Sequence, residues 1–194
     1  MKLLAFASVC ALAAGAASGA YFSDFESDDG GLIGTGDWEW GMPVGFDGAP
    51  YGGAEPIGGY SGDYCWGTVI GGAHSPSLDS YLTLSGVNLD LAETLSFFEY
   101  IESGSNSFDT GKVFVNGVEV YFSDGNSGLA WREVVLDLTG YGFSGVGDVV
   151  FEFHATSVVE RVGWYVDDLC ITDIPAPGTA ALFGLAGLAI RRRR

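Results

Sequence analysis

The chain has 194 residues, enough for one domain of ordinary size with short segments at its ends. Between positions 21 and 173, a stretch called the body below, only Lys112, Arg132 and Arg161 are basic against 25 acidic residues, a formal charge of −22. That charge repels phosphate and argues against nucleic acid as a partner, while 47% hydrophobic residues exclude a disordered chain.

Residues 1–20 have the layout of a secretory signal peptide. Lys2 supplies one positive charge, an apolar run extends from Leu3 to about Ala17, and Ser18 and Ala20 are the small residues of a cleavage site. The run is too short for a comfortable transmembrane span. We therefore expect export and removal of residues 1–20.

The body contains many short β-rich runs separated by Gly, Ser, Asn and Asp, and no long stretch with apolar residues at helical spacing. About ten strands with no helix between them predict an all-β fold, an antiparallel β-sandwich of the jelly-roll kind. Asn116-Gly117 predicts a tight hairpin turn. The predicted strands are Tyr21–Glu26, Asp37–Gly41, Tyr64–Ile70, Ser80–Leu84, Thr94–Ile101, Lys112–Asn116, Val118–Phe122, Trp131–Leu138, Asp148–Ser157 and Gly163–Thr172.

Gly41–Gly62 is predicted to be a long irregular loop, of a length that is usually functional or mobile. Flat aromatic side chains stack on the apolar faces of sugar rings. Trp38 and Trp40, beside the loop, and Tyr51 and Tyr60 within it are therefore the predicted contacts to a polysaccharide. The alternative is that the tryptophans belong to the core, as most do in a β-sandwich.

Acidic residues gather near both ends of the body. Asp24, Glu26 and Asp28 are spaced two apart, on one face of an extended strand, and Asp167 and Asp168 lie on the last predicted strand. In a jelly roll the first and last strands can lie side by side. Carboxylates without nearby Lys or Arg favour a cation, and Ca²⁺ fits best outside cells. The alternative is that these are solvated strand-end acids.

The order of several short motifs resembles the MAM-like jelly rolls, including the domain of immune-inhibitor-A-type proteins. In related jelly rolls, among them carbohydrate-binding modules, an acid of the first strand and one of the last share a structural calcium. The resemblance implies Glu26 and Asp168 as ligands, with Asp24 and Asp109 as weaker members. The motifs are "DFE", Trp66-Gly67, "SYLTL", "DTGKVFV", "WREVVLDLTGY" and "GWYVDDLCI".

Cys65 and Cys170 are the cysteines of the body, and they are interpreted either as one disulfide or as two buried thiols. His74 and His154 sit in no nucleophile or metal-ligand motif, and the chain has no G-x-S-x-G, H-E-x-x-H or C-x-x-C. Glu99 and Glu102 could be imagined as a glycosidase pair, but their spacing in sequence predicts no separation in space. We therefore expect a protein that is not an enzyme.

The C-terminal segment resembles the PEP-CTERM sorting signal of exported bacterial proteins. Pro175 and Pro177 precede a short apolar run, Thr179–Ile190, about 18 Å long as a helix, and four arginines close the chain. Ala176 stands where the usual motif has Glu. The resemblance implies recognition by an exosortase after transient membrane association, and the alternative is an unprocessed tail anchor. The arginines are Arg191, Arg192, Arg193 and Arg194.

Taken together, the sequence predicts three parts: a signal peptide (1–20), a jelly-roll domain (21–173) and a sorting tail (174–194) with an apolar helix. The predicted function is adhesion to extracellular polysaccharide by a non-enzymatic protein of the cell envelope surface or the extracellular matrix. The alternatives are a purely structural matrix protein without a specific glycan and a secreted hydrolase.

Overall fold

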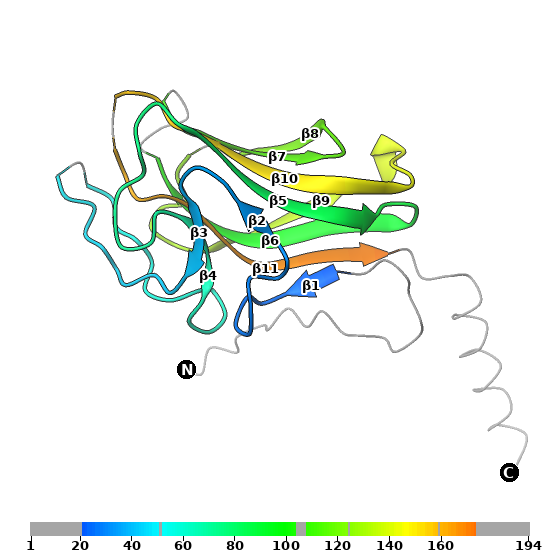
Figure 1. Ribbon diagram of the computed structural model, residues 1–194, viewed down its shortest axis with the longest axis horizontal. Coiled ribbons are helices and arrows are strands. Elements are labelled where there is room, and N and C mark those ends of the chain that lie inside the picture. Colours follow the sequence, from blue (N-terminus) through cyan, green and yellow to red (C-terminus); the bar gives the residue numbers. More distant parts are fainter. Residues whose placement is uncertain (1–20, 51, 104–107, 124, 159, 174–194) are drawn as a thin grey trace, which may run out of the picture.

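The computed structural model describes residues 21–173 apart from 51, 104–107, 124 and 159. The expectations for the signal peptide, for Tyr51 and for the sorting tail fall outside these residues. Within them every regular element is a strand except one 3-10 turn, η1 (Thr139–Tyr141), and no helix there is long and apolar enough to cross a membrane. The fold is an all-β antiparallel sandwich, which confirms the predicted class (Figure 1).

The strands form two layers. The ten predicted strands are all present, with shifted ends. The structure adds one strand, β2, which has only two residues and is too short to be recognised from the sequence pattern. One sheet has the order β3 (Trp38–Gly41), β4 (Cys65–Thr68), β11 (Gly163–Asp173), β6 (Ala92–Glu102) and β9 (Arg132–Asp137), with β1 (Tyr21–Ser23) also paired to β11. The other has the order β2 (Ile33–Gly34), β5 (Asp79–Asn88), β10 (Val146–His154), β7 (Thr110–Val115) and β8 (Val118–Ser123).

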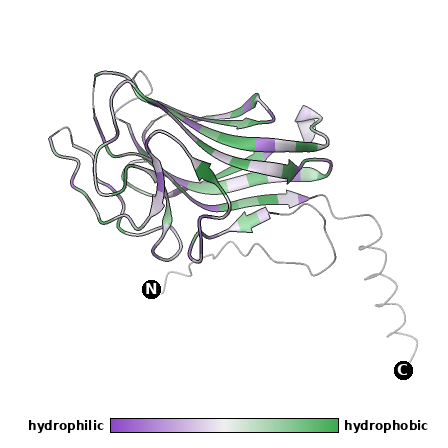
Figure 2. Cartoon of the chain, in the orientation of Figure 1, coloured by the Kyte–Doolittle hydropathy of each residue, from purple (hydrophilic) through white to green (hydrophobic). Residues whose placement is uncertain are grey.

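Local sequence explains the best-defined hairpin and strand. Asn116 and Gly117, between β7 and β8, have φ of +48° and +78°, as the tight turn predicted from this dipeptide requires. Along β10, Val149, Phe151 and Phe153 are fully buried, so alternate residues face the core. Figure 2 shows the resulting alternation of apolar and polar bands along the strands.

The core fills the space between the inner faces of the two sheets. Phe97 of β6 contacts Phe151 of β10 edge to face, with ring centroids 5.1 Å apart, and Phe151 meets Trp164 of β11 at 5.7 Å. Burial of each such ring contributes about 2 to 3 kcal/mol. The inner faces are therefore occupied by packing, and ligand contacts must come from the outer faces or the loops.

One buried carboxylate joins the two sheets. Glu99 of β6 is fully buried and accepts hydrogen bonds from Arg132 Nε of β9 at 2.6 Å and from Trp164 Nε1 at 2.8 Å. Tyr121, on β8 of the other sheet, donates its hydroxyl to the same carboxylate at 2.6 Å. Glu99 is thus committed to holding the sandwich closed at this end, which removes it from the imagined glycosidase pair.

Glu99→Gln is expected to destabilise the protein by about 3 kcal/mol, because it leaves the Arg132 guanidinium without its buried counter-charge. Urea unfolding followed by tryptophan fluorescence measures the change. Glu133→Gln, one residue from Arg132 but exposed, is the matched control and should stay within about 0.5 kcal/mol of the parent. An unfolding midpoint for Glu99→Gln equal to that of the control would contradict this role.

Candidate functional site

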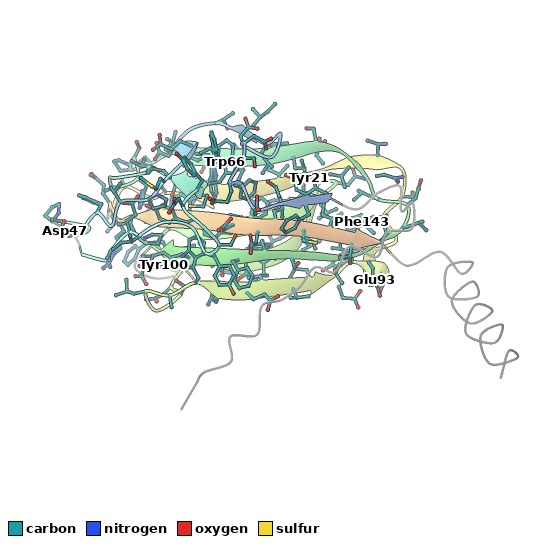
Figure 3. The ribbon with its side chains drawn as sticks, turned by 90° about the horizontal axis from the view of Figure 1, so that it is seen from below. Tyr21, Asp47, Trp66, Glu93, Tyr100 and Phe143 are labelled. Atoms are coloured by element: carbon teal, nitrogen blue, oxygen red, sulfur yellow. The ribbon has the colours of Figure 1, made fainter. Side chains whose placement is uncertain are left out.

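The long loop packs on the outer face of the six-stranded sheet, the face seen in Figure 3. The Tyr100 hydroxyl, on β6, donates to the carbonyl of Ala54 at 2.5 Å, and the Tyr165 hydroxyl, on β11, donates to Glu55 at 3.3 Å. Phe46 packs against a small apolar cluster that contains both tyrosines. The loop therefore covers one end of this face with its own buried contacts.

Glu55 is the anchor of the loop. Its side chain is only 3% exposed, although it belongs to an irregular segment. One carboxylate oxygen accepts the backbone amides of Val44 at 3.1 Å and Phe46 at 3.0 Å, and the other accepts the amide of Gly71 at 2.7 Å. With the bond from Tyr165, four donors satisfy one buried charge and fix the shape of the loop.

A β-bulge in β11 brings two consecutive carboxylates to the same face. Asp167 pairs with Phe98 and Cys170 with Ser96, so two residues of β11 lie opposite one residue of β6. Asp168 takes the left-handed conformation, with φ of +48°, which Asp tolerates better than most residues. Regular alternation would have put Asp167 and Asp168 on opposite faces.

The end of the loop is bonded to these acids. The Ser61 amide donates to Asp167 at 3.0 Å and the Ser61 hydroxyl to Asp168 at 2.6 Å, while Glu26 accepts the amides of Asp63 and Tyr64 at 2.9 and 2.7 Å. The first and last strands, which can lie side by side in a jelly roll, do so here, since β1 pairs antiparallel with β11.

The acids crowd one another electrostatically. Burial raises the pKa of Asp167 to about 7. Hydrogen bonds from the backbone amides of Ser61 and Asp168 lower this pKa, while the negative charge of the Asp168 side chain raises it further. Burial likewise raises the pKa of Asp168, helped by the charges of Asp24 and Glu26. Among the described residues, however, no three His, Cys, Asp or Glu side chains are arranged to hold a metal ion as they stand.

Beside this acidic corner, the outer face of the six-stranded sheet is hollowed. The hollow measures about 290 Å³ and is called the sheet groove below. Its middle is one row across four strands, in which Phe22, Cys170, Ser96 and Val135 are successive register partners. The lining residues are Phe22, Ser96, Phe97, Phe98, Glu133, Val135, Asp168, Cys170 and Thr172.

Aromatic rings stand at the groove. Phe22, which lines it from β1, is 48% exposed. Tyr60, from the end of the long loop, stacks on Phe98 with the rings nearly parallel and their centroids 3.4 Å apart, and Trp131 meets Tyr60 edge-on at 6.5 Å. The groove thus combines exposed aromatic surface with the hydroxyls of Ser96 and Thr172 and two carboxylates.

The structure separates the predicted sugar contacts. Trp38 is 5% exposed and packs on Trp164 at 5.7 Å, so its ring belongs to the core and offers no stacking platform. Trp40 is 37% exposed, stacks on Tyr64 and donates its indole N–H to the carbonyl of Phe25. Neither tryptophan lines the groove, whereas Tyr60 reaches its Phe98 wall.

Three of the four predicted calcium ligands lie together, and the fourth lies elsewhere. Asp24, Glu26 and Asp168 act on one another, as described, but Asp109 lies elsewhere. Its carboxylate accepts bonds from the amide and hydroxyl of Thr156 at 2.7 and 2.9 Å and lies 3.2 Å from His74 Nε2, with both side chains fully buried. Asp109 and His74 therefore hold loops together inside the fold.

The remaining candidates are also buried. Cys65 and Cys170 are not joined by a disulfide, so the interpretation as two buried thiols is the one the structure shows. Cys65 belongs to the Tyr100–Tyr165 cluster, and Cys170 lines the groove between Phe22 and Ser96. Glu102 is buried and accepts the amide of Leu129, away from Glu99's inter-sheet bridge.

Sequence reasoning missed the groove residues. Phe22 and Phe98 read as ordinary strand aromatics, and only the strand order shows that they point to the same outer face as Ser96. Glu55 carried no signal in the sequence, because its role depends on donors from three separate segments: the amides of Val44 and Phe46, the amide of Gly71 and the hydroxyl of Tyr165. The alternation of β6, with Leu95 and Phe97 buried, was the one available sign that Ser96 and Phe98 face outward.

Comparison with known proteins shows relatives of this fold. No family model matches the chain. Bacillopeptidase F of Bacillus subtilis is 26% identical over 169 residues, which cover 82% of this chain but only 11% of that protein. Among solved structures, the K2 cleaved adhesin domain of Lys-gingipain has a TM-score of 0.56 at 16% identity, covering 79% of this chain and 99% of the domain. The K1 cleaved adhesin domain of Lys-gingipain from Porphyromonas gingivalis has a TM-score of 0.56 at 14% identity, covering 80% and 98%.

Glu55→Gln is expected to loosen the long loop, because an amide can offer only one acceptor oxygen to four donors. We expect a loss of about 2 kcal/mol and faster proteolytic cleavage within residues 42–62, measured by urea unfolding and by limited digestion with mass spectrometry. Glu39→Gln, whose carboxylate is exposed and accepts the amide of Ile70, is the control. Equal cleavage rates in both variants would contradict the anchoring role.

Proposed function

We propose that the protein binds polysaccharide through the sheet groove, as a non-enzymatic adhesive module of the cell envelope surface or the extracellular matrix. The observation that carries the proposal is the joint presence of exposed aromatic rings, hydroxyls and carboxylates in one hollow of the outer sheet face. Sugar rings have apolar faces that stack on aromatic side chains and hydroxyl rims that pair with polar groups. The chain has the same fold as the K2 cleaved adhesin domain of Lys-gingipain, and an adhesive role for that domain, as its name indicates, supports the proposal.

Export and sorting form the second part of the proposal. The signal-peptide layout of residues 1–20 and the sorting tail at 174–194, with its two prolines and its arginines, support passage across a membrane and handling by an exosortase. The body's charge of −22 suits a protein that stays soluble outside the cell.

A structural calcium is the third part. Asp24, Glu26 and Asp168 share one corner between β1 and β11, and their mutual repulsion supports a cation there. Since no three carboxylates within the described part of the chain are arranged to hold an ion as they stand, binding has to draw them together. Calcium would then tie β1 and the loop end to β11 beside the groove.

Binding is tested by affinity electrophoresis of the purified protein through gels that contain a panel of soluble polysaccharides. Phe22→Ala is expected to weaken binding about ten-fold, because it removes a stacking surface worth about 1.4 kcal/mol. Phe122→Ala is the matched control, since Phe122 is 45% exposed but lies on β8 of the other sheet. If no polysaccharide retards the parent protein, the proposal fails and a purely structural matrix role is favoured.

Calcium is tested by thermal unfolding in millimolar Ca²⁺ and in excess chelator. The midpoint is expected to rise by several degrees in Ca²⁺, since an ion that binds only the folded state stabilises it by mass action. Glu26→Gln should lose this response, while Glu133→Gln keeps it. A midpoint that is the same in calcium and in chelator would count against the ion.

A further inference from the structure

The sheet groove has a one-sided charge. Glu133 of β9 and Asp168 of β11 line it, and no Lys or Arg of the described residues does. Glu133 is exposed, and its side chain forms no hydrogen bond or ion pair with another described residue. One oxygen of Asp168 accepts the Ser61 hydroxyl, and the described residues offer no donor to the other. Both carboxylates of the groove thus have oxygens that can accept hydrogen bonds from a ligand.

The three cations of the body all lie elsewhere. Arg132 turns toward the inter-sheet bridge and bonds to Glu99 at 2.6 Å. Lys112 lies on β7 of the other sheet and pairs with Glu119 at 3.0 Å. Arg161 precedes β11 at the loop end, near Gly53 and Glu102. None of them neutralises the groove, whose negative charge is reinforced by Asp24 and Glu26 next to Asp168.

The apolar part of the lining limits which cation can enter. Phe22, Phe98 and Val135 present carbon surface beside the two carboxylates, so a small hydrated ion would leave most of the lining without contacts. A hollow of about 290 Å³ is at the small end of the range for ligand sites. It has the size to hold a few residues of a sugar chain and is too small to receive the surface of another protein. The complementary ligand has an apolar face, hydroxyls and a positive charge.

We propose that the groove selects a sugar chain whose residues carry protonated amino groups. Glu133 receives the ammonium, together with Asp168 where no calcium is bound, and Phe22, beside the Tyr60–Phe98 stack, receives the apolar ring face. This rests on the proposed polysaccharide binding and names its chemical class: an N-deacetylated amino-sugar polymer. Chains of uronic acids are repelled by the same carboxylates. Neutral glycans keep the stacking contacts but lose the ion pair.

The test compares binding of short oligosaccharides, so that the overall charge of the protein does not trap a long polycation. Isothermal titration at physiological salt uses four probes: an oligomer of glucosamine, the same oligomer fully N-acetylated, a neutral β-glucan oligomer and an oligouronate. The parent protein is expected to bind the glucosamine oligomer most tightly and the oligouronate least. Raising the salt should weaken only the glucosamine complex.

Glu133→Gln is the decisive variant, because its exposed side chain makes no contact on which folding depends. We expect it to weaken glucosamine binding about three- to five-fold and to leave the N-acetylated oligomer unchanged. Glu152→Gln is the matched control, with the same change of charge on β10 of the opposite sheet. Runs in calcium and in chelator separate this effect from any ion near Asp168.

Each outcome decides between the two proposals. Preference for the amine that Glu133→Gln reduces and Glu152→Gln does not supports the inference. Equal affinity for the amine and its acetylated form, or an equal loss in both variants, overturns the inference but leaves polysaccharide binding standing. Tighter binding of the oligouronate overturns it as well. Failure of all four probes and of the polysaccharide panel removes the proposed function itself.

Discussion

The shape of the outer sheet face depends on one buried carboxylate. Glu55 sits in the middle of a long glycine-rich loop and receives three backbone amides and a tyrosine hydroxyl. Burying a charge is costly unless all its acceptor capacity is used, so the four donors cannot easily be exchanged for water. Because the loop is fixed at Glu55, its far end reaches the sheet at a defined point, where Tyr60 stacks on Phe98.

The second constraint is the bulge in β11, which meets the loop there. It turns Asp167 and Asp168 to the same face, where Ser61 bonds to both. The approach is close: a side chain on Gly62, which has φ of +74°, would collide with the Glu26 carboxylate. Loop, bulge and the segment after the first strand are therefore held together by these bonds and form the acidic wall of the groove.

Much of the fold could be predicted from sequence because alternation, turn residues and strand propensity are local. The ten strands and the Asn116–Gly117 turn were predicted, and the predicted jelly roll allowed the pairing of first and last strands that the structure shows. The groove was not, since it depends on which strands are neighbours and on a bulge that local sequence does not announce. Trp38 illustrates the limit. Its residue type and its place beside the loop suggested a platform for sugar rings, but it packs against Trp164 in the core. The resemblances to MAM-like domains and to sorting signals stay predictions.

The central claim is that ligand binds on the outer face of the six-stranded sheet. Amide NMR spectra of the isotopically labelled protein, recorded during titration with a bound oligosaccharide, test it most directly. The account predicts shifts concentrated at the groove and the loop end that borders it, at Phe22, Tyr60, Ser96, Phe98, Glu133 and Val135. Shifts concentrated on the opposite sheet instead, around Ile33, Tyr81 and Phe122, would contradict it.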